Sequence, residues 1–434
     1  MIKPAMTKTA MTKTEKKTCI IIGASHAGGQ VAISLRQSGW EGDIVLIGEE
    51  KYAPYHRPPL SKDFLATDFL SDDPDIDDKG INDILIRPLE TYETADIICV
   101  HGMKVHSIHK GDRLVFLEGG ETLQYDKLVL ATGARPRELT IPGEDIPGVH
   151  YLRCANDVLA IRTKIKAGKR AVIIGGGYIG LETAASLTKQ GMKVTVLEME
   201  DRILQRVTAP VMSDFYRRTH TEEGVNIVEN CAATEIHHAN GNGLKVITTN
   251  GEFDADIIIV GIGVVPNIEL AQECGLAVGN GIIVDENCRT SDPHIYAIGD
   301  VTWHHNPIYD THLRLESVPN ATDQAKTAAL AICGNPKPYN ALPWFWSDQF
   351  DLKLQIAGLS NGYDNIVLRG DPSTGRSFAA FYFKGDKLLA VDAVNRPQEY
   401  MIGKRLIPQT MDKTKTIDKK ALADETVPLK TFLK

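Results

Sequence analysis

The chain has 434 residues, of which 43% are hydrophobic and 24% are charged. This composition is typical of a globular protein with two to four domains. The formal net charge of −8 argues against general nucleic-acid binding. No apolar run reaches the roughly 20 residues that a helix needs to cross a bilayer.

Seven cysteines are scattered along the chain, and none forms a Cys-x-x-Cys pair. The usual zinc spacings and the usual dithiol redox motif are therefore excluded. Free, dispersed cysteines favour a reducing, cytoplasmic compartment. The adjacent His304 and His305 resemble a metal pair only superficially, because no cysteine or carboxylate stands at ligand spacing beside them. We expect no metal.

The N-terminus contains an exact repeat, since residues 5–9 and 10–14 both read Ala-Met-Thr-Lys-Thr. The repeat is polar and lacks the apolar core of a secretory signal. We expect residues 1–17 to form a disordered leader.

A dinucleotide-binding fingerprint follows. An apolar strand over residues 19–22 leads into Gly-Ala-Ser-His-Ala-Gly at residues 23–28, and a helical pattern comes next. Glycines in this pattern let backbone amides approach a pyrophosphate at the N-terminus of the helix. Ser25 replaces the middle glycine, so this copy is imperfect. Glu49 closes the next strand and is the candidate partner of the ribose hydroxyls.

The segment after this unit divides into a loop, a connection and several strands. Prolines fix the backbone of the loop over residues 52–62, so we expect it to be rigid. Residues 68–83 are acid-rich and predict an exposed connection. Strand-like segments then continue to residue 136.

The second fingerprint is complete. Residues 175–180 read Gly-Gly-Gly-Tyr-Ile-Gly, between an apolar strand at residues 171–174 and a helical pattern. Glu198 closes the next strand, where a carboxylate favours the free 2′-hydroxyl of NADH over the 2′-phosphate of NADPH. Arg202, four residues later, would weaken that preference. We place this unit at residues 151–251, and two units predict two dinucleotide cofactors.

The remaining chain contains no third fingerprint. Residues 256–263 predict a buried strand, residues 295–300 a strand that ends in Asp300, and residues from about 320 to 333 a helix. The first nucleotide domain is therefore expected to be interrupted by the second. Beyond residue 336, strand and turn patterns predict an additional domain. The expected fold class is α/β, with two Rossmann-like domains followed by a C-terminal α+β domain.

Motifs outside the fingerprints resemble those of ferredoxin reductases of the putidaredoxin reductase type, within the glutathione-reductase-like FAD/NAD(P) oxidoreductases. The resemblance extends over nearly everything after residue 18. The matching segments are Arg-Pro-Pro-Leu-Ser-Lys at 57–62, Ala-Thr-Gly-Ala-Arg-Pro at 131–136, Ala-Ile-Gly-Asp at 297–300, and residues 316–320, 343–349, 390–397 and 425–430.

This resemblance implies FAD bound by residues 18–150 and 252–336, NADH bound by residues 151–251, and an α+β interface domain at residues 337–434. The implied FAD-binding residues are Gly23, Ser25, Ala27, Gly28, Glu49, Arg57, Lys62, Val105, Ala131, Thr132, Gly133, Arg135, Asp300, Val318 and Trp346. The implied NAD-binding residues are Gly175, Gly177, Tyr178, Ile179, Gly180, Glu198 and Gly263.

Several of these residues have roles that the resemblance implies. Asp300 would hold the ribityl chain of FAD. Val318 would begin a helix whose N-terminal dipole stabilises negative charge on the reduced flavin. The expected catalytic residues are Lys62, near the reactive ring nitrogen, and Glu182, which would pair with it where nicotinamide docks. Trp346 would lie close to the flavin edge.

The implied activity is hydride transfer from NADH to FAD, followed by single-electron transfers to a [2Fe–2S] ferredoxin that feeds an oxygenase, in particular a haem monooxygenase. Disulfide reductases of the same fold need a dithiol that this chain lacks. Lys326, Lys404 and Arg405 are candidate contacts for an acidic ferredoxin. Two alternatives remain open: a rubredoxin or Rieske-ferredoxin reductase, and a non-enzymatic flavoprotein of the apoptosis-inducing-factor type.

Overall fold

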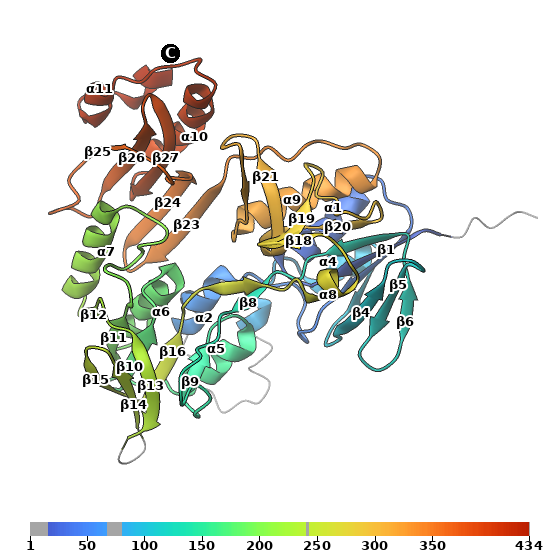
Figure 1. The fold of residues 1–434 in the computed structure, drawn as a ribbon, viewed down its shortest axis with the longest axis horizontal. Helices are drawn as coiled ribbons and strands as arrows, with labels where there is room; N and C mark the ends of the chain where they lie inside the picture. The colour runs from blue at the N-terminus through green and yellow to red at the C-terminus, as the bar shows by residue number, and fades with distance from the viewer. Residues whose placement is uncertain (1–15, 67–79, 240–242, 434) are drawn as a thin grey trace, which may run out of the picture.

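The computed structural model describes residues 16–66, 80–239 and 243–433, which form three domains (Figure 1). Residues 1–15 of the expected leader and 68–79 of the expected acid-rich connection lie outside the described residues. No helix in the described part of the chain is long and apolar enough to cross a membrane.

The first domain is built on a parallel sheet with the strand order β20-β7-β1-β2-β3. Its strands are β1 (Thr18–Ile22), β2 (Asp43–Ile47), β3 (Ile97–Val100), β7 (Lys127–Leu130) and β20 (Ile295–Ala297). Helices α1 (His26–Gln37) and α9 (Val318–Ile332) cover one face, where Ile21 is buried. The strands β4 (Val105–His109), β5 (Leu114–Leu117) and β6 (Thr122–Gln124) cover the other face, where Ile20 is buried. Burial on both faces explains the continuous apolar runs of these strands.

The second domain repeats this plan, with a parallel sheet of order β12-β11-β10-β16-β9. Its strands are β9 (Val149–Tyr151), β10 (Arg170–Ile174), β11 (Lys193–Leu197), β12 (Asn226–Val228) and β16 (Ile257–Val260). Its helices are α5 (Ala155–Arg162), α6 (Tyr178–Lys189) and α7 (Pro210–Glu222). An antiparallel meander covers the other face and consists of β13 (Ala233–His238), β14 (Leu244–Thr248) and β15 (Gly251–Ala255).

The sheet pairing corrects the expected limits of the second unit, which we had placed at residues 151–251. Strand β16 pairs in parallel with both β10 and β9. The second sheet therefore begins at residue 149 and continues through residue 260. In the sequence, the end of the antiparallel meander near residue 255 looks like the end of the domain. The chain then continues into β16, which lies between β10 and β9 in the second sheet.

The third domain is an antiparallel sheet with the order β23-β24-β27-β26-β25. Its elements are β23 (Trp344–Gln349), β24 (Leu352–Gly358), β25 (Asn365–Arg369), β26 (Phe378–Lys384), β27 (Lys387–Val394), α10 (Pro397–Met411), α11 (Lys419–Ala423) and η3 (Leu429–Leu433). One face packs on α10, and the other packs on the second domain.

Short elements connect these parts. They are η1 (Pro58–Ser61), α2 (Asp63–Ala66), α4 (Leu89–Thr94), β8 (Ala134–Pro136), β17 (Val264–Pro266), α8 (Glu269–Glu273), β18 (Val278–Gly279), β19 (Gly281–Val284), η2 (Gly299–Val301), β21 (Thr302–Asn306) and β22 (Thr311–Leu313). Strands β8 and β17 pair antiparallel where the chain passes between the first two domains.

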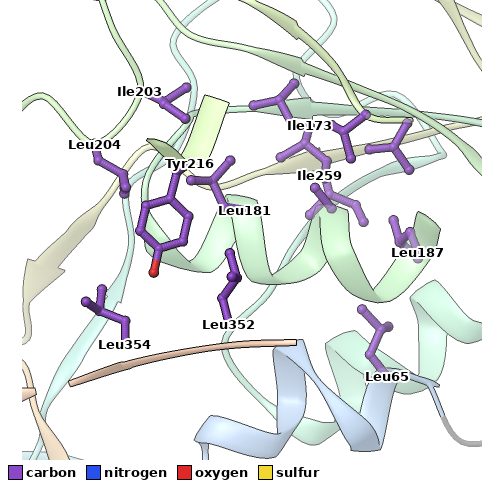
Figure 2. Packing of buried hydrophobic residues seen from close by; sticks show 14 of the residues in the cluster. Leu65, Ile173, Leu181, Leu187, Ile203, Leu204, Tyr216, Ile259, Leu352 and Leu354 are labelled. Carbon is purple, nitrogen blue, oxygen red and sulfur yellow. The ribbon is translucent and has the colours of Figure 1, made fainter. Parts of the chain in front are cut away.

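One hydrophobic cluster joins all three domains (Figure 2). Leu181 and Leu187 of α6 pack against their own sheet, while Leu65 of α2 and Leu352 of β24 contribute from the first and third domains. Helix α6 therefore lies at the place where the three domains meet, and this location fixes the position of its polar residues.

Candidate functional site

Two glycine loops lie at the carboxyl ends of equivalent strands, between β1 and α1 and between β10 and α6. Gly23 and Gly175 have φ values of +110° and +113°, and a Cβ on either would lie 2.2 or 2.4 Å from a backbone carbonyl oxygen. Both positions therefore require glycine. Neither α1 nor α6 has a side-chain hydrogen bond at its N-cap. The first amides of both helices are thus left to bind an anion.

The middle position of the fingerprint differs between the two loops. A Cβ on Gly177 would meet no atom within 4 Å, so the space beside this loop is open to a ligand. In the first loop, the Ser25 hydroxyl accepts a hydrogen bond from Arg57 Nε at 3.2 Å. Arg57 also donates to the carbonyl of Arg153 at 2.7 Å and forms an ion pair with Glu50. The serine is therefore tied into a network of cationic and polar groups, which suits a pyrophosphate.

A single open cleft brings many of the expected residues together. Its lining includes Ser25, Ala27, Arg57, Lys62, Ala131, Gly133, Tyr178, Ile179, Glu182, Asp300, Val318 and Trp346. These residues come from all three domains. The cleft therefore joins the first glycine loop to the start of α6, as a site for hydride transfer between two dinucleotides requires.

The expected catalytic pair is formed. Lys62 Nζ lies 2.6 Å from Glu182 Oε2, and the two side chains are 16% and 5% exposed. Lys62 follows η1, and Glu182 lies in the second turn of α6. An ion pair that is largely removed from water is held more firmly than a surface pair.

Asp300 and Val318 also line the cleft. Asp300 lies in η2, directly after β20, and Arg153 Nη2 approaches its carboxylate at 3.5 Å. Val318 is the first residue of α9, whose N-cap Ser317 accepts a hydrogen bond from the Asn320 amide at 3.3 Å. Helix α9 thus begins at the cleft wall, where its dipole favours negative charge.

The Glu198 carboxylate is fixed beside the second glycine loop. It accepts hydrogen bonds from the backbone amides of Gly176 at 2.7 Å and Glu200 at 2.9 Å. Arg202 is held elsewhere, because it donates to Ser213 Oγ at 2.6 Å and to a backbone carbonyl. The structure therefore gives no support to the expectation that Arg202 weakens the preference for NADH.

Several expected binding residues do not line the cleft. The Glu49 side chain is 72% exposed and lies 3.7 Å from Lys104. Val105 is buried in the core of the first domain. Thr132 donates to the Asn267 carbonyl at 2.8 Å, and Arg135 pairs with Glu269 at the same distance. The remaining expected residues outside the cleft lining are Gly23, Gly28, Gly175, Gly177, Gly180, Glu198 and Gly263. Direct binding by these residues stays a prediction.

Sequence reasoning missed Arg153, His26, Ser61 and Ser347. Arg153 and His26 line the cleft, and His26 Nε2 contacts His56 Nδ1 at 3.3 Å. Ser61 and Ser347 each donate to Glu182 at 2.6 Å. Ser61 and His26 carried a local signal, since Ser61 lies inside the proline-rich loop and His26 inside the first glycine fingerprint.

The fold and cleft define a reductase of the two-dinucleotide class. The chain belongs to the pyridine nucleotide-disulphide oxidoreductase family, whose profile matches residues 17–325, and it carries the reductase C-terminal domain at residues 344–433. The expected fold class and both cofactors, FAD and NADH, are confirmed.

Individual relatives narrow the class to ferredoxin reductases. The chain is 41% identical to putidaredoxin reductase CamA of Pseudomonas putida over 421 residues, which cover 95% of this chain and 96% of the relative. It superimposes with a TM-score of 0.88 and 40% identity on the reductase of a covalent putidaredoxin reductase–putidaredoxin complex, covering 96% and 98% of the two chains. The chain also superimposes on the ferredoxin reductase of the CYP199A2 system from Rhodopseudomonas palustris, with a TM-score of 0.89 and 40% identity. The superposition covers 96% of this chain and 99% of that structure. The resemblance to putidaredoxin reductase-like enzymes is confirmed.

Proposed function

We propose that the chain is an NADH-dependent ferredoxin reductase that delivers single electrons to a [2Fe–2S] ferredoxin serving an oxygenase, with a haem monooxygenase as the terminal enzyme. One observation carries the proposal: a single cleft joins the first dinucleotide loop to the start of α6, which follows the second loop, and contains the Lys62–Glu182 pair. When bound, FAD supplies the conversion between two-electron and one-electron transfer that links NADH to an iron–sulfur protein.

The residues of the chain bind and orient the two cofactors. The free amides at the starts of α1 and α6 bind the two pyrophosphates, and Arg57 adds positive charge at the first of them. The anchored Glu198 carboxylate selects the adenosine ribose of NADH. The Lys62 ammonium is a positively charged hydrogen-bond donor at the cleft, and Glu182 serves as its counter-ion, so no counter-ion from solvent is needed.

The state of the cysteines supports direct electron transfer from the flavin to the acceptor protein, without a dithiol intermediate. None of the residues that line the cleft is a cysteine, and all seven cysteines are free thiols. Burial raises the pKa of Cys99 and of Cys154 to about 11, so neither is a thiolate at neutral pH. A dithiol relay of the disulfide-reductase kind is therefore not available. The free thiols also support the proposed cytoplasmic location.

The docking surface is proposed to lie on the third domain and on α9. Lys404 lies over the Trp344 ring at 5.0 Å, and Arg405 is exposed on the same helix. Lys326 of α9 is also exposed, with Asp323 at 3.7 Å. Trp346 lines both the cleft and an adjoining groove on the third domain. Only the Trp346 side chain would separate an acceptor bound in this groove from the cleft.

The proposal is tested by steady-state reduction of candidate ferredoxins from the same organism, with a rubredoxin and ferricyanide as comparison acceptors. One [2Fe–2S] ferredoxin is expected to be reduced much faster than the rubredoxin. The double variant Lys404→Glu with Arg405→Glu should slow ferredoxin reduction and weaken its salt dependence, while ferricyanide reduction stays unchanged. Faster reduction of the rubredoxin than of every ferredoxin would show that the partner is a rubredoxin. Equal effects on both acceptors would remove the docking role of α10.

A further inference from the structure

Side chains from all three domains meet on the Glu182 carboxylate. Oε2 accepts hydrogen bonds from Ser61 Oγ and Lys62 Nζ of the first domain, both at 2.6 Å. Oε1 accepts a hydrogen bond from Ser347 Oγ of β23, in the third domain, also at 2.6 Å. Glu182 is only 4% exposed, and Ser347 is fully buried. A buried carboxylate is costly unless donors surround it, and here each oxygen has at least one.

The polar chain continues behind Ser347. Gln349 Nε2 donates to Ser347 Oγ at 3.0 Å, and Gln349 Oε1 lies 2.8 Å from Nε2 of the buried His220 on α7. Burial lowers the pKa of His220 to about 4, so the ring is neutral at pH 7. Because the amide oxygen only accepts, the single ring proton of His220 is on Nε2.

These assignments fix the direction of every bond in the chain. His220 donates to Gln349, and Gln349 donates to Ser347. Ser347 has one proton, and it is left to donate to Glu182. A hydroxyl that accepts on one side polarises its own donated bond on the other side. The third domain thus presents a donor of fixed orientation to Glu182.

We propose that Ser347 is a positioning residue for hydride transfer, which acts through Glu182 to fix the Lys62 ammonium at the cleft. Ser347 does not line the cleft, whereas its neighbours Phe345 and Trp346 do. Its hydroxyl shares the negative charge of Glu182, and this leaves more of the Lys62 charge directed toward the cofactor. The inference rests on the proposed function, because it assigns a task within that reaction.

The direct test compares the FAD-loaded wild type with Ser347→Ala and Ser347→Thr under anaerobic rapid mixing with NADH. In Ser347→Ala the limiting rate of flavin bleaching should fall by about tenfold, while the apparent Kd for NADH changes less than about twofold. The flavin midpoint potential should become more negative, because Glu182 then neutralises Lys62 more completely. Ser347→Thr restores the donor and should recover both the rate and the potential.

Thr410→Val is the matched control. Thr410 is a buried third-domain residue whose hydroxyl accepts from the Leu388 amide at 3.0 Å, away from the cleft lining. This variant should lower the Tm but leave the limiting rate and the potential at the wild-type values. If Ser347→Ala does not fold, Ser347→Cys keeps the side-chain size with a weaker donor, and it should change the rate and the potential in the same direction.

The proposal is overturned if Ser347→Ala, or Ser347→Cys in its place, keeps the wild-type limiting rate and midpoint potential, even with a lower Tm. This outcome is distinct from failure of the proposed function. The midpoint potential requires only bound FAD, so it tests Ser347 even if no ferredoxin is reduced.

Discussion

Asp392 is a buried carboxyl group at the contact between the second and third domains, and its ionisation should make stability depend on pH. It is 3% exposed and lies on β27. Tyr382 Oη is 2.6 Å from its Oδ2, and Thr208 Oγ1 is 2.7 Å from the same atom. The partly buried Tyr178 and the fully buried Tyr216 also lie within electrostatic range. Burial raises the pKa of Asp392 from 3.8 to about 6, although both hydroxyls favour the ionised form.

The sign and size of the effect follow from this shift. The folded state binds the proton of Asp392 more tightly than the unfolded state does, so the favourable contribution is complete below pH 3.8. It is lost as the pH rises through about 6. At about 1.4 kcal/mol for each pKa unit, the free energy of unfolding should lose about 3 kcal/mol over this interval from Asp392 alone.

The assay is urea unfolding of the FAD-loaded protein from pH 4 to pH 7.5, for the wild type and for Asp392→Asn. The amide cannot ionise, so between pH 4 and pH 7.5 the variant should gain about 2 kcal/mol relative to the wild type. Asp371→Asn is the control whose profile should run parallel to that of the wild type in this range, because Ser373 and Thr374 lower the pKa of the exposed Asp371 to about 2 and its contribution is lost only below pH 4. Parallel stability profiles for the wild type and Asp392→Asn would refute the reasoning.

Three further predictions concern the cofactor sites. Glu198→Ala should shift the ratio of kcat/KM for NADPH over NADH upward by about tenfold, because the repulsive carboxylate is removed; an unchanged ratio would show that Glu198 does not select the cofactor. Arg57→Ala should weaken FAD binding by about tenfold, as measured by flavin fluorescence on reconstitution, since one charge-assisted contact and the tie to Ser25 are lost; full retention of FAD during dilution would contradict this. Lys62→Met should slow flavin bleaching by NADH by about 100-fold with FAD content preserved, because a preorganised donor is lost and Glu182 is left buried without its cation; a normal limiting rate would exclude Lys62 from hydride transfer.

The sequence predicted the two glycine loops because their determinants are local. Gly23 and Gly175 are required by their φ angles, and Gly28 and Gly180 by the backbone carbonyl oxygens of Gly23 and Gly175, all within the same strand–loop–helix units. The interruption of the first domain could also be inferred, because the segment ending in Asp300 brings no new fingerprint. The end of the second domain could not, since β16 is an apolar run whose partners, β9 and β10, are set by long-range pairing.

The site itself was predicted only where a motif or the family resemblance identified the residues. Glu182 lies in a helix pattern that permits a solvated acid, but the third domain covers it and leaves it 4% exposed. Its partner Ser347 is 165 positions away in the chain. Contacts of this separation depend on how domains dock, which is not encoded in periodicity or spacing near either residue.

The two loops differ in a way that predicts different rates of ligand exchange. In the first loop, Ser25 is tied through Arg57 to Glu50 and to the Arg153 carbonyl, so the loop is held by several fixed contacts from distant segments. In the second loop, Gly177 borders open space. A preorganised loop held by several fixed contacts favours tight binding and slow release of its ligand, whereas an open loop allows rapid exchange. The imperfect fingerprint is therefore suited to a resident flavin and the perfect one to a nicotinamide cofactor that binds and leaves in each catalytic cycle.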